Sequence, residues 1–133
     1  MEMTEKTTHD IRVKVIAQYE PHMSAPDQPE YIFSYLIKIE NKSPYRVQLL
    51  RRKWFILDYT SVIPIERVVE GEGVVGELPV LEPDESYSYT SFCRLSSTNG
   101  EMSGFYTFFN FSEYEEFEVE IPSFALNTPW VLN

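Results

Sequence analysis

The stretch Tyr31-Ile-Phe-Ser-Tyr-Leu-Ile-Lys-Ile-Glu40 decides the fold, because every second residue from Tyr31 to Ile39 is aromatic or a branched aliphatic. Polar residues such as Ser34 and Lys38 lie between them. Side chains two residues apart project from the same face of an extended strand. The stretch is therefore predicted to form a strand with one buried face and one face in water.

The same period of two recurs in both directions along the chain. Residues 11–15, 87–95 and 117–121 repeat it with β-branched and aromatic side chains, which favour strands. Turn-forming pairs such as Pro83-Asp84 and Asn99-Gly100 separate the runs. The predicted strands are 11–19, 30–40, 46–58, 62–69, 85–95, 102–111 and 116–121.

Short strands with turn signals between them predict an all-β fold, an antiparallel sandwich of immunoglobulin or fibronectin III type with about seven or eight strands. An eight-stranded barrel is the alternative. Trp54, on the third predicted strand, would be the buried tryptophan of such a sandwich. The 133 residues are expected to form a single domain, 1–133, in which the polar residues 1–10 are a flexible tail.

Composition and charge exclude two classes of protein. Hydrophobic residues make up 43% of the chain and aromatic residues 15%, which excludes an intrinsically disordered protein. The formal net charge of −10 argues against a nucleic-acid partner, because the phosphate backbone is itself negative. The charge is unevenly distributed, since residues 1–65 carry nine basic and eight acidic side chains, whereas residues 66–133 carry two and thirteen.

Basic and acidic residues each cluster at one place in the sequence. Arg46, Arg51, Arg52 and Lys53 form the basic group, and residues 113–120 form the acidic one. Both groups are interpreted as solvated outer faces, paired with one another across a sheet, because exposed charge is the ordinary state of a protein surface. The alternative is that the basic group is a surface for a charged partner.

Other features bear on the environment of the protein. No stretch approaches the roughly 18 apolar residues that a membrane helix needs, and the first ten residues lack the pattern of a secretory signal. The single cysteine, Cys93, excludes an internal disulfide, and its place in the alternation predicts a buried structural thiol. We therefore expect a cytoplasmic protein with no membrane partner.

The stretch Gly71-Glu-Gly73-Val-Val-Gly76 has the spacing of a dinucleotide-binding fingerprint. In that motif the glycines follow a parallel strand and open a helix. Here Pro79 and Pro83 follow, which disfavours a helix, and Glu72 would repel a phosphate. We predict instead a glycine-hinged loop that leaves a strand, whose backbone N–H groups could bind an anion or a partner's carboxylate.

Residues with catalytic or metal-binding chemistry are scattered. His9 and His22 lie in predicted loops and match no metal-ligand spacing. Glu116, Glu118 and Glu120 share one face of a predicted strand, where a solvated acidic surface is expected. The sequence predicts no catalytic residue, no cofactor and no specific metal site, and therefore a protein that is not an enzyme.

Aromatic residues crowd one short window. Most of them are expected in the core, and a surplus is expected to form an exposed patch of the kind that marks a protein interface. The aromatic residues of this window are Phe105, Tyr106, Phe108, Phe109 and Phe111.

Several collinear motifs resemble the ApaG family. They are Gln48-Leu-Leu-Arg-Arg-Lys-Trp-Phe-Ile-Leu-Asp58, Val69-Glu-Gly-Glu-Gly-Val-Val-Gly-Glu-Leu-Pro79 and Phe117-Glu-Val-Glu-Ile-Pro122. The resemblance covers nearly the whole chain. It implies a fibronectin III or immunoglobulin-like sandwich and no established enzymatic activity. In eukaryotic proteins the same domain acts in protein–protein contacts, and some bacterial members are linked to cobalt tolerance and magnesium efflux.

Three functions follow as hypotheses. The first is a non-enzymatic binding module for an as yet unidentified protein, with the loop of Gly71, Glu72, Gly73 and Gly76 as the candidate surface, the basic group as a second, and edge strands that could pair between copies. The second is binding of a divalent cation, held weakly, or of an anion. The third is a nucleotide-processing enzyme, which rests only on the glycine spacing and on the association of the family with a dinucleotide hydrolase gene cluster.

Overall fold

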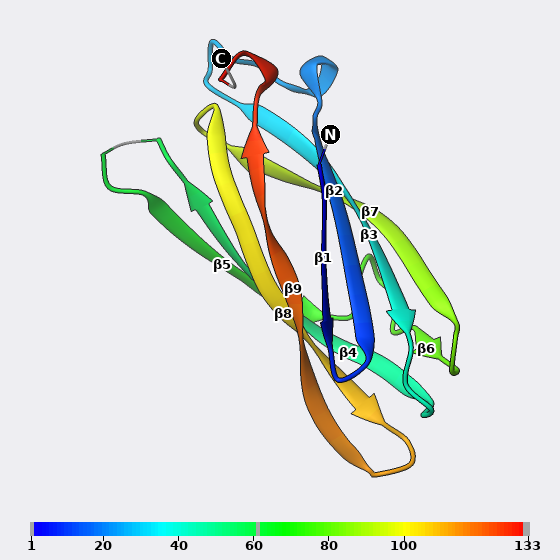
Figure 1. Cartoon of the computed structure of the whole chain (residues 1–133). Helices are drawn as coiled ribbons and strands as arrows, with labels where there is room; N and C mark the ends of the chain where they lie inside the picture. The colour runs from blue at the N-terminus through cyan, green and yellow to red at the C-terminus, as the bar shows by residue number, and fades with distance from the viewer. Residues whose placement is uncertain (1, 61, 132–133) are drawn as a thin grey trace.

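The computed structural model describes residues 2–60 and 62–131, which form two antiparallel β-sheets packed face to face (Figure 1). One sheet has the strand order β1-β2-β3-β7 and the other β5-β4-β8-β9, with β6 paired to β4. The strands are β1 (Met3–Thr8), β2 (Ile11–Tyr19), β3 (Tyr31–Asn41), β4 (Val47–Asp58), β5 (Ile65–Glu72), β6 (Val80–Leu81), β7 (Ser86–Leu95), β8 (Asn99–Asn110) and β9 (Glu115–Asn127). The predicted all-β sandwich is confirmed.

Helical structure is limited to two short 3-10 turns in the part of the chain that is described, η1 (Pro21–Met23) and η2 (Pro129–Val131). None of the described helices is long and apolar enough to cross a membrane.

The alternation in β3 builds the middle of the core. Phe33, Tyr35, Ile37 and Ile39 are buried, as predicted, because this strand lies between β2 and β7 and faces the second sheet. Trp54 of β4 packs opposite them and is 2% exposed, which confirms its predicted place in the core. Burying these large side chains removes apolar surface from water at a gain of about 25 cal/mol per Å².

The two sheets also share a polar contact in the core. The hydroxyl groups of Tyr89 in β7 and Tyr106 in β8 lie 2.5 Å apart. Burial raises the pKa of both side chains, so both stay neutral, and one hydroxyl donates a hydrogen bond to the other without introducing a buried charge.

The flexible tail predicted for residues 1–10 is wrong. Met3–Thr8 form β1, which pairs with β2 along its whole length. The reversal uses His9 and Asp10 at φ angles of 48° and 62°. A hairpin is usually recognised from an alternation of apolar and polar residues and from a glycine in the turn. Residues 4–8 are all polar and the turn has no glycine, so neither signal is present.

β9 runs on past the predicted end at residue 121. β9 has one extra residue in its pairing with β8: Pro122 and Ser123 lie where β8 has only Ser103, because Gly104 pairs with Ile121 and Met102 with Phe124. Pro122 therefore sits inside the strand, where an edge position and a bulge tolerate its missing N–H.

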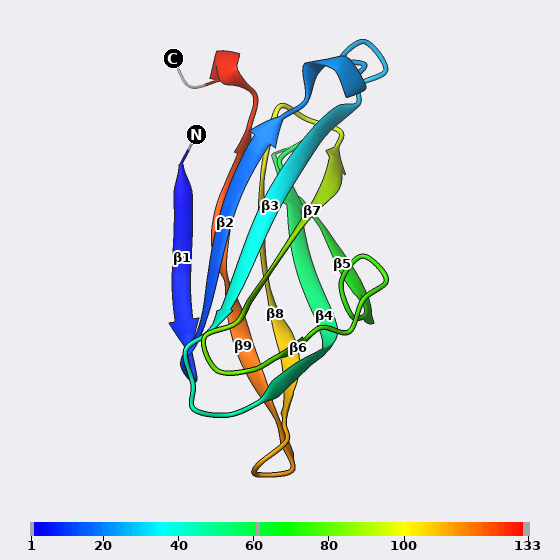
Figure 2. The ribbon, with the colours of Figure 1, turned by 90° about the vertical axis from the view of Figure 1, so that its right-hand side faces the viewer.

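The two sides of the sandwich are closed differently. On one side β1 and β2 pack against β9, so that edge of the second sheet is covered. On the other side β5 is the edge strand of its sheet, and no strand of residues 2–60 or 62–131 other than β4 pairs with it (Figure 2). β5 is exposed along nearly its whole length.

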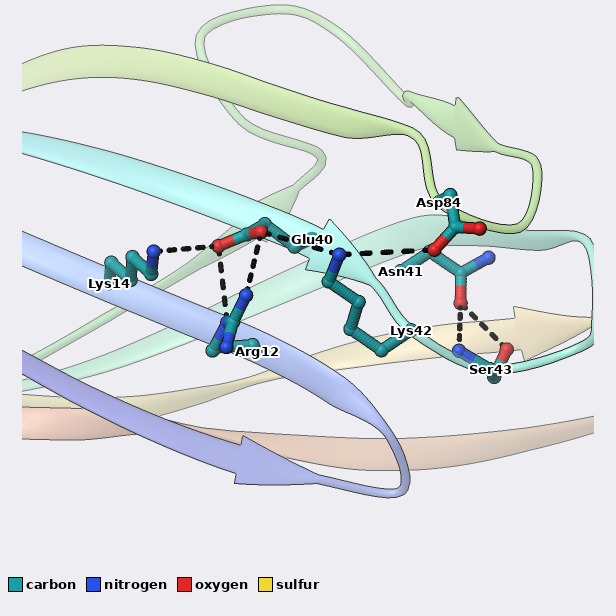
Figure 3. A network of polar contacts seen from close by, with 7 residues as sticks. All are labelled: Arg12, Lys14, Glu40, Asn41, Lys42, Ser43 and Asp84. Atoms are coloured by element: carbon teal, nitrogen blue, oxygen red, sulfur yellow. Dashed lines mark hydrogen bonds and ion pairs between the residues drawn. The ribbon is translucent and has the colours of Figure 1, made fainter.

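A cluster of charges holds the end of β3 to β2 (Figure 3). Glu40 accepts hydrogen bonds from Nε and Nη2 of Arg12 at 3.2 and 3.0 Å, and the Nζ atom of Lys14 lies 3.1 Å away. Lys42 is a more distant partner at 3.8 Å. The Arg12 guanidinium lowers the pKa of Glu40 from 4.5 to about 2, although burial acts in the opposite direction.

Next to this cluster, Asn41 is fully buried and acts as a hub for the loops at this end of the sandwich. Its side-chain Nδ2 donates to the carbonyl oxygens of Tyr45 and Leu81 at 2.7 and 3.0 Å. Its Oδ1 accepts from the backbone N–H of Ser43 at 3.0 Å (Figure 3). Each buried polar atom of this amide thus has a partner, which avoids the cost of an unsatisfied group.

Candidate interaction surface

The two candidate surfaces from the sequence are neighbours in space. In the antiparallel pairing of β4 with β5, Arg51 lies opposite Glu72, Arg52 opposite Gly71 and Lys53 opposite Glu70. A shallow depression of about 520 Å³ opens over these residues on the outer face of the sheet. The loop and most of the basic group therefore form one surface.

Arg46 lies apart from the other three basic residues. Its Nε atom is 3.2 Å from a carboxylate oxygen of Glu82, and its guanidinium carbon is 5.2 Å from the centre of the Phe111 ring. The basic group is therefore divided between two places on the surface.

Most of the basic side chains are neutralised by acidic neighbours. Arg51 pairs with Glu116 of β9, across the width of the sheet, and Lys53 lies 3.0 Å from Glu70. The predicted pairing of the basic group with residues 113–120 is seen only at Arg51 and Glu116, whereas Arg46 and Lys53 pair with other glutamates. Exposed pairs of this kind contribute little to stability, but they leave little positive charge for a partner.

Arg52 differs from its neighbours because it points toward the other sheet. Its Nη1 atom donates to the carbonyl oxygens of Glu72 and Gly73, both at 2.9 Å. A Cβ atom at Gly71 would lie 2.8 Å from the guanidinium nitrogens. Glycine at position 71 thus allows the guanidinium to lie flat against the backbone of β5.

The glycine motif forms a turn at the end of an antiparallel strand, as predicted. Gly73 and Gly76 have φ angles of 59° and 80°, and Val74 and Glu77 bridge the turn. A Cβ atom at Gly73 would lie 2.1 Å from the carbonyl oxygen of Glu77, so only glycine fits there. The described residues after the turn continue into β6 and not into a helix, unlike a dinucleotide-binding motif.

Sequence reasoning missed the most apolar part of this surface. β5 and the segment that follows it carry aliphatic side chains that are 38–56% exposed. The sequence of β5 did not reveal this exposure, because a strand with apolar residues on both faces is usually buried on both faces. These exposed side chains are Ile65, Val68, Val69, Val75, Leu78 and Val80.

The aromatic window is divided between core and surface. Tyr106 and Phe108 are fully buried, whereas Phe105, Phe109 and Phe111 are half-buried on the outer side. Phe109 packs edge to face with Phe111, with ring centres 5.2 Å apart. The surplus predicted from the sequence therefore lies on the outer face of β8 and beyond its end, partly covered by neighbouring rings.

The remaining candidates are also engaged in structural contacts. His9 packs edge to face against Phe117 at 5.6 Å, and Glu120 pairs with Lys6 of β1. Burial raises the pKa of Cys93, against the opposing charge of Arg67, so its thiol is not activated as a nucleophile. Among the residues that the structure describes, no three His, Cys, Asp or Glu side chains are placed together to hold a metal ion.

Comparison with known proteins places these features in a family. Residues 21–110 match the ApaG domain. Protein ApaG of Methylobacterium sp. (strain 4-46) is 41% identical over 129 residues, covering 97% of this chain and 96% of that protein. Protein ApaG of Parvibaculum lavamentivorans is 42% identical over 122 residues, covering 92% and 91%.

A solved structure agrees with the fold. The crystal structure of the putative ApaA protein from Bordetella pertussis matches with a TM-score of 0.85 and 36% sequence identity, over 92% of this chain and 97% of the other. The two-sheet architecture is therefore shared along almost the whole length of both proteins.

Proposed function

This chain belongs to the ApaG family, and we propose that it is a non-enzymatic binding module that holds an extended segment of a partner protein along strand β5. The observation that carries the proposal is the edge of β5. Within the described residues this strand pairs only with β4, and its aliphatic side chains are exposed. An edge strand with such side chains is a template for a further strand.

The other sheet edges are protected against strand addition. β1 and β9 lie against each other at the closed side of the sandwich. β7 presents Ser86, Ser88 and Thr90 on its solvent face, and polar side chains on an edge disfavour association; a single aromatic side chain, Phe92, is exposed farther along the same face. β5 thus combines a free edge with exposed apolar side chains.

The charges around β5 define the chemistry of the partner. β5 carries three glutamates, Glu66, Glu70 and Glu72, and side chains directly opposite in a strand pair are about 5 Å apart. A second copy of this chain, with a net charge of −10, would bring like charges together. The partner is therefore a different protein whose segment alternates basic with apolar side chains.

The test compares capture of proteins from a lysate of the native cell by three forms of the full chain. The Val68→Lys variant places a charge at the centre of the β5 edge, on a side chain that is 50% exposed and so not needed for folding. The Leu36→Lys variant is the matched control, because Leu36 is 46% exposed on β3, away from β5.

The proposal requires a protein that the wild type and the Leu36→Lys variant retain equally and that the Val68→Lys variant loses by about tenfold or more. Chemical cross-links must join that protein to residues of β5. A partner retained by all three forms, or cross-links confined to another face, would contradict the proposal. A dimer of the chain in light scattering that Val68→Lys disrupts would show instead that a second copy occupies the edge.

A further inference from the structure

A cavity of about 210 Å³ opens on the uncovered side of the sandwich, where β5 and β4 of one sheet face β7 of the other. Arg67 of β5 crosses this opening: its Nη2 atom donates to the carbonyl oxygen of Arg94 and lies 3.8 Å from Sγ of Cys93. Arg52 of β4 also lines the cavity.

The charges at this cavity are unbalanced. In the described part of this acidic chain, most lysine and arginine side chains have a carboxylate within 4 Å, but Lys38, Arg52, Arg67 and Arg94 do not. Three of these four line the same cavity, and no carboxylate stands among the lining residues. Burial and, to a smaller extent, the carboxylate of Asp58 raise the pKa of Cys93, a lining residue, but Asp58 does not itself line the cavity.

Both arginines have donors to spare. Arg52 uses Nη1 for the carbonyl oxygens of Glu72 and Gly73, and Arg67 uses Nη2 for that of Arg94. A guanidinium carries five N–H donors in a planar fork, so each side chain keeps at least two for another acceptor. The existing bonds fix the position of each fork, which lowers the entropy lost when an anion binds.

The rest of the wall favours a charged hydrogen bond. Trp54, Ile56, Val69 and Met102 form part of the wall, and charges beside buried apolar groups are screened less than charges in bulk water. Tyr35 lines it too. Burial raises the pKa of this tyrosine, so its hydroxyl group stays protonated and able to donate.

We propose that this cavity binds a single oxyanion group, a carboxylate or a phosphate, at the free guanidinium donors of the arginines that line it, Arg67 first among them and Arg52 on the same wall. The volume sets the limit on size, because pockets for whole drug-sized ligands start near 300 Å³. The site therefore takes one anionic group, either free in solution or on the tip of an acidic side chain. It does not depend on the proposed partner at β5, since the isolated chain already holds both arginines in place.

The test is a titration of the isotope-labelled full chain with sodium phosphate, followed by NMR, with sodium chloride at matched ionic strength as the reference. Saturable shifts are expected at the indole N–H of Trp54 and at the Nε–H of Arg52 and Arg67. Arg67→Met should weaken binding by about tenfold or more, because it removes one of two charge-assisted forks. Arg67→Lys keeps the charge without the fork and should weaken binding by about threefold to tenfold.

Lys38→Met is the matched control, since Lys38 is another cation without an ion pair in the described residues but lies on β3, outside the cavity. It should change the affinity by less than about twofold. Shifts that follow ionic strength alike for phosphate and chloride, or binding that persists undiminished in Arg67→Met, would overturn the site.

A parallel titration with N-acetyl glutamate amide distinguishes the two sources of the oxyanion. Tighter binding of this compound than of phosphate would identify an acidic side chain as the natural occupant, and the reverse order would identify a free anion. Because these titrations use the chain alone, their outcome is independent of whether a protein partner is found at β5.

Discussion

Around Glu40 three cationic side chains converge on one carboxylate, whereas the cavity between β5 and β7 is lined by three arginines that have no carboxylate partner among the described residues. In both clusters an arginine donates hydrogen bonds to oxygen atoms: Arg12 to the carboxylate of Glu40, and Arg52 to the backbone carbonyl of Glu72. They differ in the source of the negative charge. Glu40 supplies it for Arg12 and Lys14, whereas the proposed site at the cavity would take it from a bound anion.

This difference separates a structural cluster from a binding cluster. Ion pairs completed within the chain fix strand β3 against β2, and their loss is felt as a loss of stability. An arginine pair without its counter-charge adds little to stability and is complete only when an anion arrives. Removing a charge from the Glu40 cluster should therefore lower the free energy of unfolding, whereas removing an arginine from the cavity should weaken anion binding.

The largest effect is expected at Gly73, whose carbonyl oxygen helps to hold Arg52. In Gly73→Ala the new Cβ atom would meet the carbonyl oxygen of Glu77 at 2.1 Å, at a φ angle of 59° that L-residues disfavour. We expect a loss of about 2–4 kcal/mol in the free energy of unfolding, measured by urea denaturation, together with weaker phosphate binding.

Gly76→Ala is the control for this prediction. Gly76 has a φ angle of 80°, but nothing lies within 4 Å of a Cβ atom built there. The cost should fall to about 1–2 kcal/mol, which is the strain of the backbone alone. Equal losses in the two variants would show that the contact with Glu77 relaxes freely.

The strands were predictable from the sequence, and the reason is visible in particular residues. β2 and β3 were placed to within a residue of their ends, because Val13, Val15, Ile37 and Ile39 all obey a period of two on a single buried face. β1 was missed because both of its faces are polar and its turn uses His9 and Asp10 instead of glycine.

The site was predictable only in part. The loop at residues 71–76 carries its own signal, because glycines at positive φ are needed for the turn. The cavity carries none: Arg52 and Arg67 lie on different strands, and only the register that sets Arg52 opposite Gly71 and Arg67 opposite Ile56 turns both to the same face of the sheet, along which the cavity lies. Register and the offset of two sheets are tertiary properties, which local patterns do not encode.

The second largest effect is expected at Glu40, which is 8% exposed. Glu40→Gln keeps the shape of the side chain and removes the charge that Arg12 and Lys14 share. Two cations are then left facing each other, and we expect a loss of about 1–3 kcal/mol in the free energy of unfolding. A Glu120→Gln variant, which breaks the exposed pair with Lys6, should lose less than about 1 kcal/mol.

The same carboxylate predicts how stability depends on pH. The pKa of Glu40 is lowered from 4.5 to about 2 in the folded chain. A lowered pKa contributes stability that is complete above the unfolded value and is lost as the pH falls from 4.5 toward 2. Unfolding followed between these pH values should show a smaller loss in Glu40→Gln than in the wild type. Parallel curves for the two proteins would contradict this assignment.

The smallest effect on stability, and the sharpest contrast with Glu40, is expected from Arg67→Met. Arg67 is exposed, has no carboxylate partner in the described chain and gives up only its contacts with Arg94 and Cys93. In chloride buffer the free energy of unfolding should change by less than about 1 kcal/mol. In phosphate the wild type should gain stability by mass action and the variant should not. If Arg67→Met in chloride lost as much free energy of unfolding as Glu40→Gln, Arg67 would have a structural role. The two clusters would then both serve stability, and their contrast would fail.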